Sequence, residues 1–135
     1  MHLSKVESVF GPTNPSPESQ ADAGVRRFGS VIGLDPAKEK YYRELHADVW
    51  PSILKRLEES HVRNYSIYMT EIEGRKYLFS YFEYFGKDLE SDMKAISEDP
   101  EMQRWWTETD PCQIQLPSRK EGANWSEMEM VFHAD

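Results

Sequence analysis

The stretch from residue 61 to residue 85, HVRNYSIYMTEIEGRKYLFSYFEYF, decides the fold. Its first part alternates in polarity, with Tyr65, Ile67 and Met69 on one side, which is typical of a strand with one buried face. A turn containing glycine follows, and residues 77–85 then form a second run that is bulky at nearly every position. The two runs together predict a β-hairpin whose second strand is covered on both faces.

The residues before this hairpin predict a strand and then a helix. Residues 26–34 are a short apolar run that ends in a turn signal, which indicates a strand. Asp35 and Pro36 mark a helix start, because an aspartate caps the free N–H groups of the first turn and proline fits the first helical position. Pro51 lies inside the helical pattern, so we expect the helix to break near Trp50 and to resume afterwards.

Two further helices and a last strand follow the hairpin. Residues 88–97 carry one apolar face and predict a helix, and residues 102–106 predict a short one. Residues 110–125 contain two prolines and mixed polar side chains, so we expect a long loop. Residues 126–133 alternate again and predict a final strand.

The first 24 residues differ in composition from the rest of the chain. They contain three prolines and many small polar residues, without a sustained apolar period. Such a segment buries too little apolar surface to offset the entropy lost on ordering. We therefore predict a flexible N-terminal tail over residues 1–24 and one folded domain over residues 25–135.

The predicted order is β-α-β-β-α-β, the ferredoxin-like arrangement of the α+β class. It consists of an antiparallel four-stranded sheet with helices on one face. The second face would be bare and aromatic, and a patch of that kind needs a cover. The same sheet of a second copy, related by a two-fold axis, is the simplest cover. We therefore expect a homodimer with facing sheets, a dimeric α+β barrel.

Charge and composition narrow the classes of function. The 135 residues fit one domain, and 24 acidic against 16 basic side chains give a net charge of −8. An acidic surface repels nucleic-acid phosphates and anionic membranes, and no apolar run is long enough to span a bilayer. Cys112 is the only cysteine, which excludes an internal disulfide and thiolate-cluster zinc sites and suits a reducing, cytoplasmic location.

The candidate catalytic residue is His46. It lies four residues after Tyr42 and four before Trp50, so the three side chains share one helix face. A histidine between aromatic rings can have a pKa near neutrality, which suits proton transfer. The alternative is a packed, hydrogen-bonded histidine without a catalytic role. The sequence contains no His-rich metal spacing, Gly-rich phosphate loop or Gly-x-Ser-x-Gly nucleophile motif.

The candidate binding residues are aromatic. Trp105 and Trp106 point about 100° apart on a helix, so one can be core while the other lines a pocket. Flat aromatic faces suit the C–H faces of sugars, although simple core packing is the alternative. Tyr65 and Asn64 point to opposite faces of their strand, and a buried Tyr65 hydroxyl needs a partner from the protein or from a ligand.

Four ordered motifs resemble the L-rhamnose mutarotase family across about residues 26–133. Residues 42–51 resemble its Tyr-x-x-x-His-x-x-x-Trp-Pro signature, and residues 64–68 resemble its Asn-Tyr-x-Ile-Tyr strand. Residues 104–106 resemble its Arg-Trp-Trp, and residues 130–132 its closing Glu-Val-Phe, with Met in place of Glu. The resemblance implies the family's dimeric ferredoxin-like barrel, in agreement with the predicted order of elements.

The resemblance also implies a reaction and a set of site residues. The reaction interconverts the α and β anomers of a free sugar by ring opening and closure, and needs no metal or organic cofactor. The family's proton donor corresponds to His46. Its sugar-contacting tyrosines correspond to Tyr42 and Tyr65, and the tryptophans that frame its pocket to Trp105 and Trp106.

Three features depart from the family pattern. The N-terminal tail is additional, Ser52 stands where glutamate is common, and residues 107–117 match poorly. The last difference adjoins the pocket and can change sugar preference, so the expected substrate is L-rhamnose or a similar 6-deoxyhexose such as L-fucose. Two other functions stay open at this point: a cofactor-free oxygenase or haem-degrading domain on the same barrel, and a non-catalytic sugar-binding module.

Overall fold

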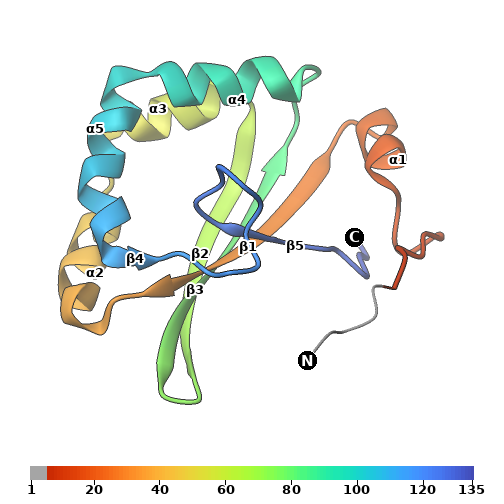
Figure 1. Cartoon of the computed structure of the whole chain (residues 1–135). Coiled ribbons are helices and arrows are strands. Elements are labelled where there is room, and N and C mark those ends of the chain that lie inside the picture. Colours follow the sequence, from red (N-terminus) through yellow and green to blue (C-terminus); the bar gives the residue numbers. More distant parts are fainter. Residues whose placement is uncertain (1–5) are drawn as a thin grey trace.

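A curled antiparallel sheet with helices along one side forms the frame of the molecule (Figure 1). The computed structural model describes residues 6–135. The helices are α1 (Pro17–Asp22), α2 (Glu39–Ala47), α3 (Pro51–Glu59), α4 (Leu89–Glu98) and α5 (Pro100–Thr109), with short 3-10 turns η1 (Pro36–Lys38) and η2 (Asp110–Cys112). The strands are β1 (Arg26–Leu34), β2 (Val62–Ile72), β3 (Arg75–Tyr84), β4 (Gln113–Ile114) and β5 (Ser126–Met128).

The sheet has the strand order β2-β3-β1-β4, and every pair is antiparallel. β2 and β3 form the predicted hairpin, and β1 lies beside β3 as the ferredoxin-like order requires. The predicted fold class is therefore confirmed for the single chain. The predicted break near Trp50 is also confirmed, because α2 ends at Ala47 and α3 begins at Pro51.

The fourth strand position is divided into two short pieces. β4 pairs with the end of β1 at Gly33 and Leu34, and β5 pairs with residues 29–31 of the same strand. The prediction of a strand over residues 126–133 is wrong beyond Met128, and the predicted loop at 110–125 contains η2 and β4. Residues 115–125 leave the sheet between the two pieces, which brings them to the helical side.

The segment before β1 contains structure that the sequence did not predict. Helix α1 begins after Ser16, whose hydroxyl accepts a hydrogen bond from the Ser19 amide, and proline occupies its first position. The buried Gln20 side chain accepts a hydrogen bond from the Arg27 amide at 2.9 Å and so joins α1 to β1. The segment predicted as a flexible tail therefore contains a short helix at Pro17–Asp22. Residues 1–5 of the predicted tail lie outside the described residues.

Two apolar clusters between the sheet and the helices hold the site in place. Ile32 and Leu34 alternate along β1 and pack with Leu78, Tyr42 and Cys112. The second cluster joins α3, α4 and α5 to the sheet through Ile53, Val62, Ile96, Met102 and Trp105. Both clusters lie on the helical side, so they fix the faces of α2 and α5 that point toward β2.

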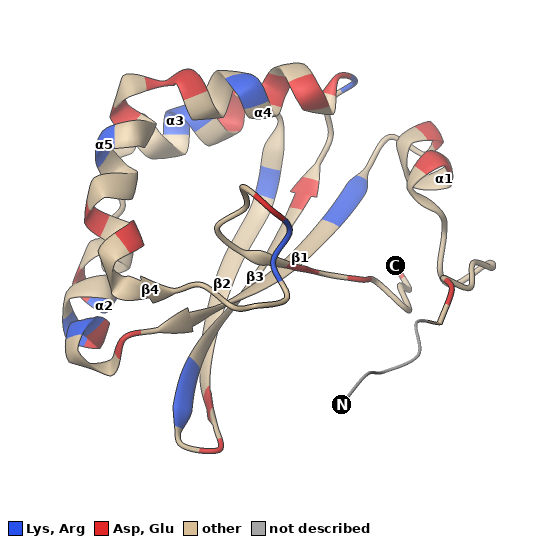
Figure 2. Cartoon of the chain, viewed as in Figure 1, with Lys and Arg blue, Asp and Glu red and all other residues tan. Residues whose placement is uncertain are grey.

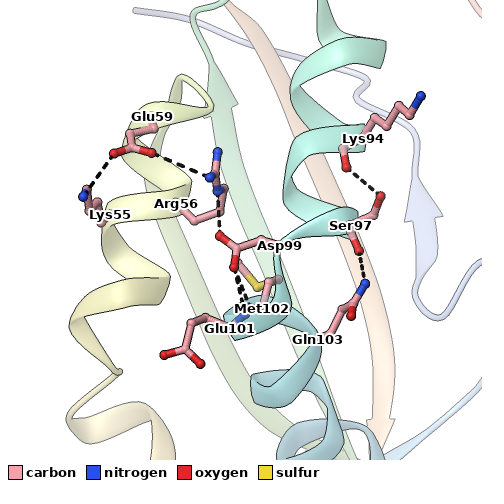
Figure 3. A network of polar contacts seen from close by, with 9 residues as sticks. All are labelled: Lys55, Arg56, Glu59, Lys94, Ser97, Asp99, Glu101, Met102 and Gln103. Atoms are coloured by element: carbon pink, nitrogen blue, oxygen red, sulfur yellow. Dashed lines mark hydrogen bonds and ion pairs between the residues drawn. The ribbon is translucent and has the colours of Figure 1, made fainter.

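A polar network outside these clusters fixes the start of α5 against α3 (Figure 3). Arg56 on α3 donates to the Asp99 carboxylate through Nε at 2.7 Å. The other oxygen of Asp99 accepts from the backbone amides of Glu101 and Met102 at 2.8 and 3.4 Å, which caps α5. Asp99 therefore both begins the helix that carries the tryptophan pair and joins it to α3.

We predict that Asp99→Ala lowers the midpoint of thermal unfolding by several degrees, because the variant loses the cap and the ion pair together. The Arg56 guanidinium is the largest cause that holds the pKa of Asp99 below its usual value. The stability from Asp99 is thus present above the carboxyl's unfolded pKa and is lost as pH falls through the folded pKa. Melting curves of both proteins should therefore differ at neutral pH and converge in acid. Equal midpoints at neutral pH would contradict this role.

Charged side chains concentrate at the edges of the molecule (Figure 2). They cover the helices and the end of the β2–β3 hairpin, whereas residues 28–34, 65–70 and 77–82 of the strands include none. The face of the sheet opposite the helices carries Val31, Tyr68 and Phe79 side by side, since these residues are register partners. Within residues 6–135, no helix is long and apolar enough to cross a bilayer.

Candidate active site

The five residues predicted to form the site line one cavity of about 430 Å³. This cavity, the polar pocket, lies between α2, α5, β2 and the segment that precedes β5. Its wall contains Tyr42, His46, Tyr65, Trp105 and Trp106. A second, largely apolar cavity of about 440 Å³ adjoins it and shares four of these residues, all except Tyr42. The sequence prediction of which residues come together is therefore consistent with the geometry.

His46 occupies the last turn of α2, directly beside Tyr42. The two rings stack with their centroids 4.0 Å apart, and Trp105 meets the imidazole edge-on at 5.3 Å. The imidazole Nδ1 lies 2.9 Å from the Tyr42 carbonyl oxygen. Because a carbonyl only accepts, Nδ1 donates this hydrogen bond, which leaves Nε2 as the nitrogen that can exchange a proton with a ligand. Burial lowers the pKa of His46, partly offset by this hydrogen bond.

Tyr42 is a buried donor at the base of the polar pocket. Its side chain is 5% exposed, and its hydroxyl makes no hydrogen bond with any other residue between 6 and 135. A buried hydroxyl without a protein partner loses free energy unless a ligand or water satisfies it. Burial also raises the pKa of Tyr42, so the phenol keeps its proton at neutral pH.

Tyr65 reaches the same pocket from the sheet because β2 contains a bulge. The pairing with β3 shifts between Arg63 and Ser66, and Asn64 adopts a φ of 52°, a left-handed conformation that asparagine tolerates. Tyr65 then stacks on Phe82 at 5.5 Å, and Asn64 points away, toward Glu83. Tyr65 is 43% exposed and lines both cavities, while the surrounding protein raises its pKa by burial.

The two tryptophans differ in burial, and both line the cavities. Trp105 is 6% exposed, belongs to the second apolar cluster and packs edge-on against Trp50 at 4.9 Å. It nevertheless lines both cavities, so it is a core residue and a wall residue at once. Trp106 is half-buried and also lines both cavities. Arg104, the third residue of the motif, lies over the Trp50 ring at 4.3 Å.

The polar pocket also contains residues that sequence reasoning missed. Asn124 donates to the Gln113 side-chain oxygen at 2.8 Å, and the same amide nitrogen lies 3.5 Å from a carboxylate oxygen of Asp110. Trp125 and Thr109 complete this side of the wall. Most of these residues lie in the segment predicted as a featureless loop. The sequence contains one indication of Asp110. It follows Trp106 by four positions, and this spacing places both side chains on one face of a helix.

The wall therefore combines one imidazole, two phenols, one carboxylate and two amides with flat aromatic surfaces. Such a set can hold a ring with several hydroxyl groups and move protons on it. Among residues 6–135, no three His, Cys, Asp or Glu side chains are grouped as a metal site would require.

Comparisons with known proteins identify the family of the chain. The sequence profile described as L-rhamnose mutarotase matches residues 27–134. The L-rhamnose mutarotase of Ligilactobacillus salivarius is 30% identical over 112 residues, covering 81% of this chain and 97% of the relative. That of Phocaeicola vulgatus is 36% identical over 82 residues, covering 61% and 74%.

A solved structure is also similar in fold. The crystal structure of an L-rhamnose mutarotase from Formosa agariphila superposes with a TM-score of 0.60 at 20% identity, covering 82% of this chain and 99% of that one. At that identity the likeness concerns the fold alone. The match of the profile across most of the sequence shows the relationship: the chain belongs to the L-rhamnose mutarotase family.

Proposed function

We propose that this chain interconverts the α and β anomers of L-rhamnose, with His46 as the group that exchanges a proton with the sugar. The observation that carries the proposal is the meeting of the motif residues from α2, β2 and α5 around one pocket. Family membership gives the reaction, and the pocket has the side chains that this reaction needs.

Ring opening requires two coordinated proton transfers. The ring oxygen O5 gains a proton as its bond to C1 breaks, and the anomeric hydroxyl loses its proton to become the aldehyde oxygen. After rotation about the C1–C2 bond, O5 attacks the other face of C1 and both protons return. His46 Nε2 would serve O5, because Nδ1 is already engaged with the Tyr42 carbonyl. Tyr42 and Tyr65 would bind sugar hydroxyls, and Trp105 and Trp106 would pack against the C–H faces and the methyl group.

Exchange spectroscopy by NMR tests the activity directly, because it detects interconversion of anomers at equilibrium. The protein should accelerate exchange between the anomeric signals of L-rhamnose well above the rate in buffer. L-fucose, measured in parallel, reports the preference between 6-deoxyhexoses. Absence of acceleration with L-rhamnose, for folded protein that binds the sugar, would favour the sugar-binding alternative. A coloured protein with bound haem would favour the haem-degrading one.

We also propose that two copies pack through the bare face of the sheet. Tyr68 is 69% exposed on the edge strand β2, and its register partner Phe79 and then Val31 continue the row as half-buried residues. A contiguous apolar and aromatic patch on a sheet face favours association, and a two-fold axis allows the patch to cover itself. A dimer of this kind would leave the helical side, with its pocket, open to solvent.

Tyr68→Asp is expected to convert the dimer into monomer, since two carboxylates would face each other across the axis without partners. Light scattering after size exclusion should give twice the chain mass of 15.8 kDa for the wild type and a single chain mass for the variant. Tyr41→Asp is the matched control, because Tyr41 is an exposed aromatic residue on α2, on the helical side. A monomeric wild type would contradict the proposal.

The proposed location is the reducing cytoplasm, as the single cysteine predicts. Cys112 is a free thiol with an exposed fraction of 1%. Burial raises the pKa of this thiol, which reduces its thiolate fraction and its reactivity. A buried, unreactive thiol fits a packing role beside Leu34 in the first apolar cluster.

A further inference from the structure

We propose that Asp110 is the second proton-transfer group of the site and accepts the proton of the anomeric hydroxyl while His46 serves the ring oxygen. This inference rests on the proposed mutarotase function and names the residue at the other end of its proton path. None of the four family motifs includes this residue, because the third ends at Trp106 and the fourth begins at residue 130. Its assignment comes from its place in the pocket wall.

Helix α5 positions Asp110 together with Trp106. The helix ends at Thr109, and Asp110 keeps helical backbone angles as its C-cap. Four residues make about one helical turn, so the carboxylate follows Trp106 along the same face of the helix. Both residues accordingly line the polar pocket that His46 lines from α2. The carboxylate and the imidazole thus line one cavity from two different helices.

One amide side chain of the missed segment, that of Asn124, contacts this carboxylate. Asn124 Nδ2 lies 3.5 Å from Asp110 Oδ1 and donates at 2.8 Å to Gln113 Oε1. Asn124 Oδ1 in turn accepts from Gln115 at 3.1 Å. Asn124 therefore contacts Asp110 and the side chains of Gln113 and Gln115. The same amides can bind the remaining hydroxyl groups of a sugar.

We assign Asp110 as the proton acceptor because the other titratable groups in the polar pocket serve as donors. Among the described residues these groups are Tyr42, His46 and Tyr65. Both phenols stay protonated and can donate hydrogen bonds at neutral pH, because the ordinary pKa of tyrosine is about 10 and burial raises that of Tyr42 further. Burial lowers the pKa of His46. Partial loss of solvent raises the pKa of Asp110, which is an exposed residue of the pocket wall. The imidazolium becomes a stronger acid and the carboxylate a stronger base, so both changes favour the same direction of transfer.

The step balances with these two groups alone. As the C1–O5 bond breaks, protonated His46 gives its Nε2 proton to O5 and Asp110 takes the proton from O1, so that C1=O1 forms. The pair is then neutral imidazole and carboxylic acid. On closure, O5 returns its proton to His46 as it attacks the other face of C1, and Asp110 returns its proton to O1. No oxidant, reductant or net proton is consumed.

The test compares Asp110→Asn with the wild type by NMR exchange spectroscopy on L-rhamnose. Asparagine keeps the shape and an acceptor for Asn124 but cannot take up the proton. We expect anomer exchange to fall by about 100-fold or more, while the dissociation constant for L-rhamnose changes by less than about threefold. The wild-type rate should also decrease in acid as Asp110 becomes protonated, and this decrease should be missing in the variant. Formate should restore exchange to Asp110→Ala.

Glu108→Gln is the matched control, because it removes a carboxylate two residues away that contacts the Tyr41 hydroxyl and is not part of the pocket wall. This variant should retain the wild-type rate. An Asp110→Asn rate within about threefold of the wild type would overturn the inference and leave the proposed function intact. A loss of sugar binding that accounts for the whole loss of rate would also overturn it. A wild type that exchanges no L-rhamnose would contradict both proposals.

Discussion

His46→Ala should lose most of the acceleration of anomer exchange, by about 10²- to 10⁴-fold, the usual contribution of one proton-transfer group. The residual rate would come from binding alone and from the other polar groups of the pocket. The measurement is exchange spectroscopy on L-rhamnose with saturating sugar, corrected for the rate in buffer. This correction is essential because mutarotation also proceeds without protein.

Two further variants distinguish the loss of proton transfer from the loss of side-chain packing. The imidazole stacks on Tyr42 at 4.0 Å, so His46→Ala also removes a packing contact. His46→Gln restores bulk and an amide that can donate to the Tyr42 carbonyl, but it cannot carry a proton between oxygens. It should therefore fold like the wild type and be as inactive as the alanine variant. His133→Ala, at a histidine that contacts Asp135 near the C-terminus, is the matched control and should keep full activity.

The dependence of the anomer-exchange rate on pH shows whether protonated or neutral His46 acts in ring opening. Burial lowers the pKa of His46, so the protonated fraction decreases as pH rises through a value below the ordinary 6.5. If the imidazolium donates to O5, the contribution of the protein to the rate should fall between about pH 5 and pH 8. A rate that rises over this range would instead give His46 the role of acceptor. His46→Gln should show neither trend.

The sequence predicted the elements whose signals are local. The alternation of residues 65–69, the Asp35-Pro36 start and the break at Pro51 all lie within a few residues of the structure they determine. The β-α-β-β-α-β order followed from these elements. Tyr42, His46 and Trp106 could be assigned to one pocket because rare, ordered motifs connect segments that are distant along the chain.

The rest of the site depends on long-range pairing, which leaves little local signal. β4 is too short to show alternation, and the alternation of residues 126–133 predicts a longer strand than β5; both strands pair with the edge that β1 offers at residues 29–34. The segment between β4 and β5 places Asn124 in the pocket wall. Its contact with Gln113 depends on the tertiary structure and leaves no pattern in the sequence. Helix α1 has a local start signal in Ser16 and Pro17, but it is only six residues long and has no apolar period of its own. The Gln20 hydrogen bond to the Arg27 amide, which joins it to β1, is visible only in the tertiary structure.

Trp105→Ala should lower the stability of the fold, and this is the second large effect that we expect. Trp105 is 6% exposed and packs against Trp50 and the apolar side chains of α3 and α4. Truncation of a buried tryptophan removes its transfer free energy and leaves a cavity, so the free energy of unfolding should fall by about 3–5 kcal/mol. Urea denaturation followed by far-ultraviolet circular dichroism measures this change.

Trp106→Ala is the natural comparison, because it removes the same side chain from the next position on α5. Trp106 is half-buried and lines both cavities, so its loss should cost less stability and should weaken sugar binding instead. The KM for L-rhamnose should rise in this variant, while the denaturation midpoint stays closer to that of the wild type than to that of Trp105→Ala. Equal losses of stability in the two variants would mean that both rings serve the core. The polar pocket would then depend on Tyr42, Tyr65 and the amides, rather than on an aromatic wall, to hold the sugar.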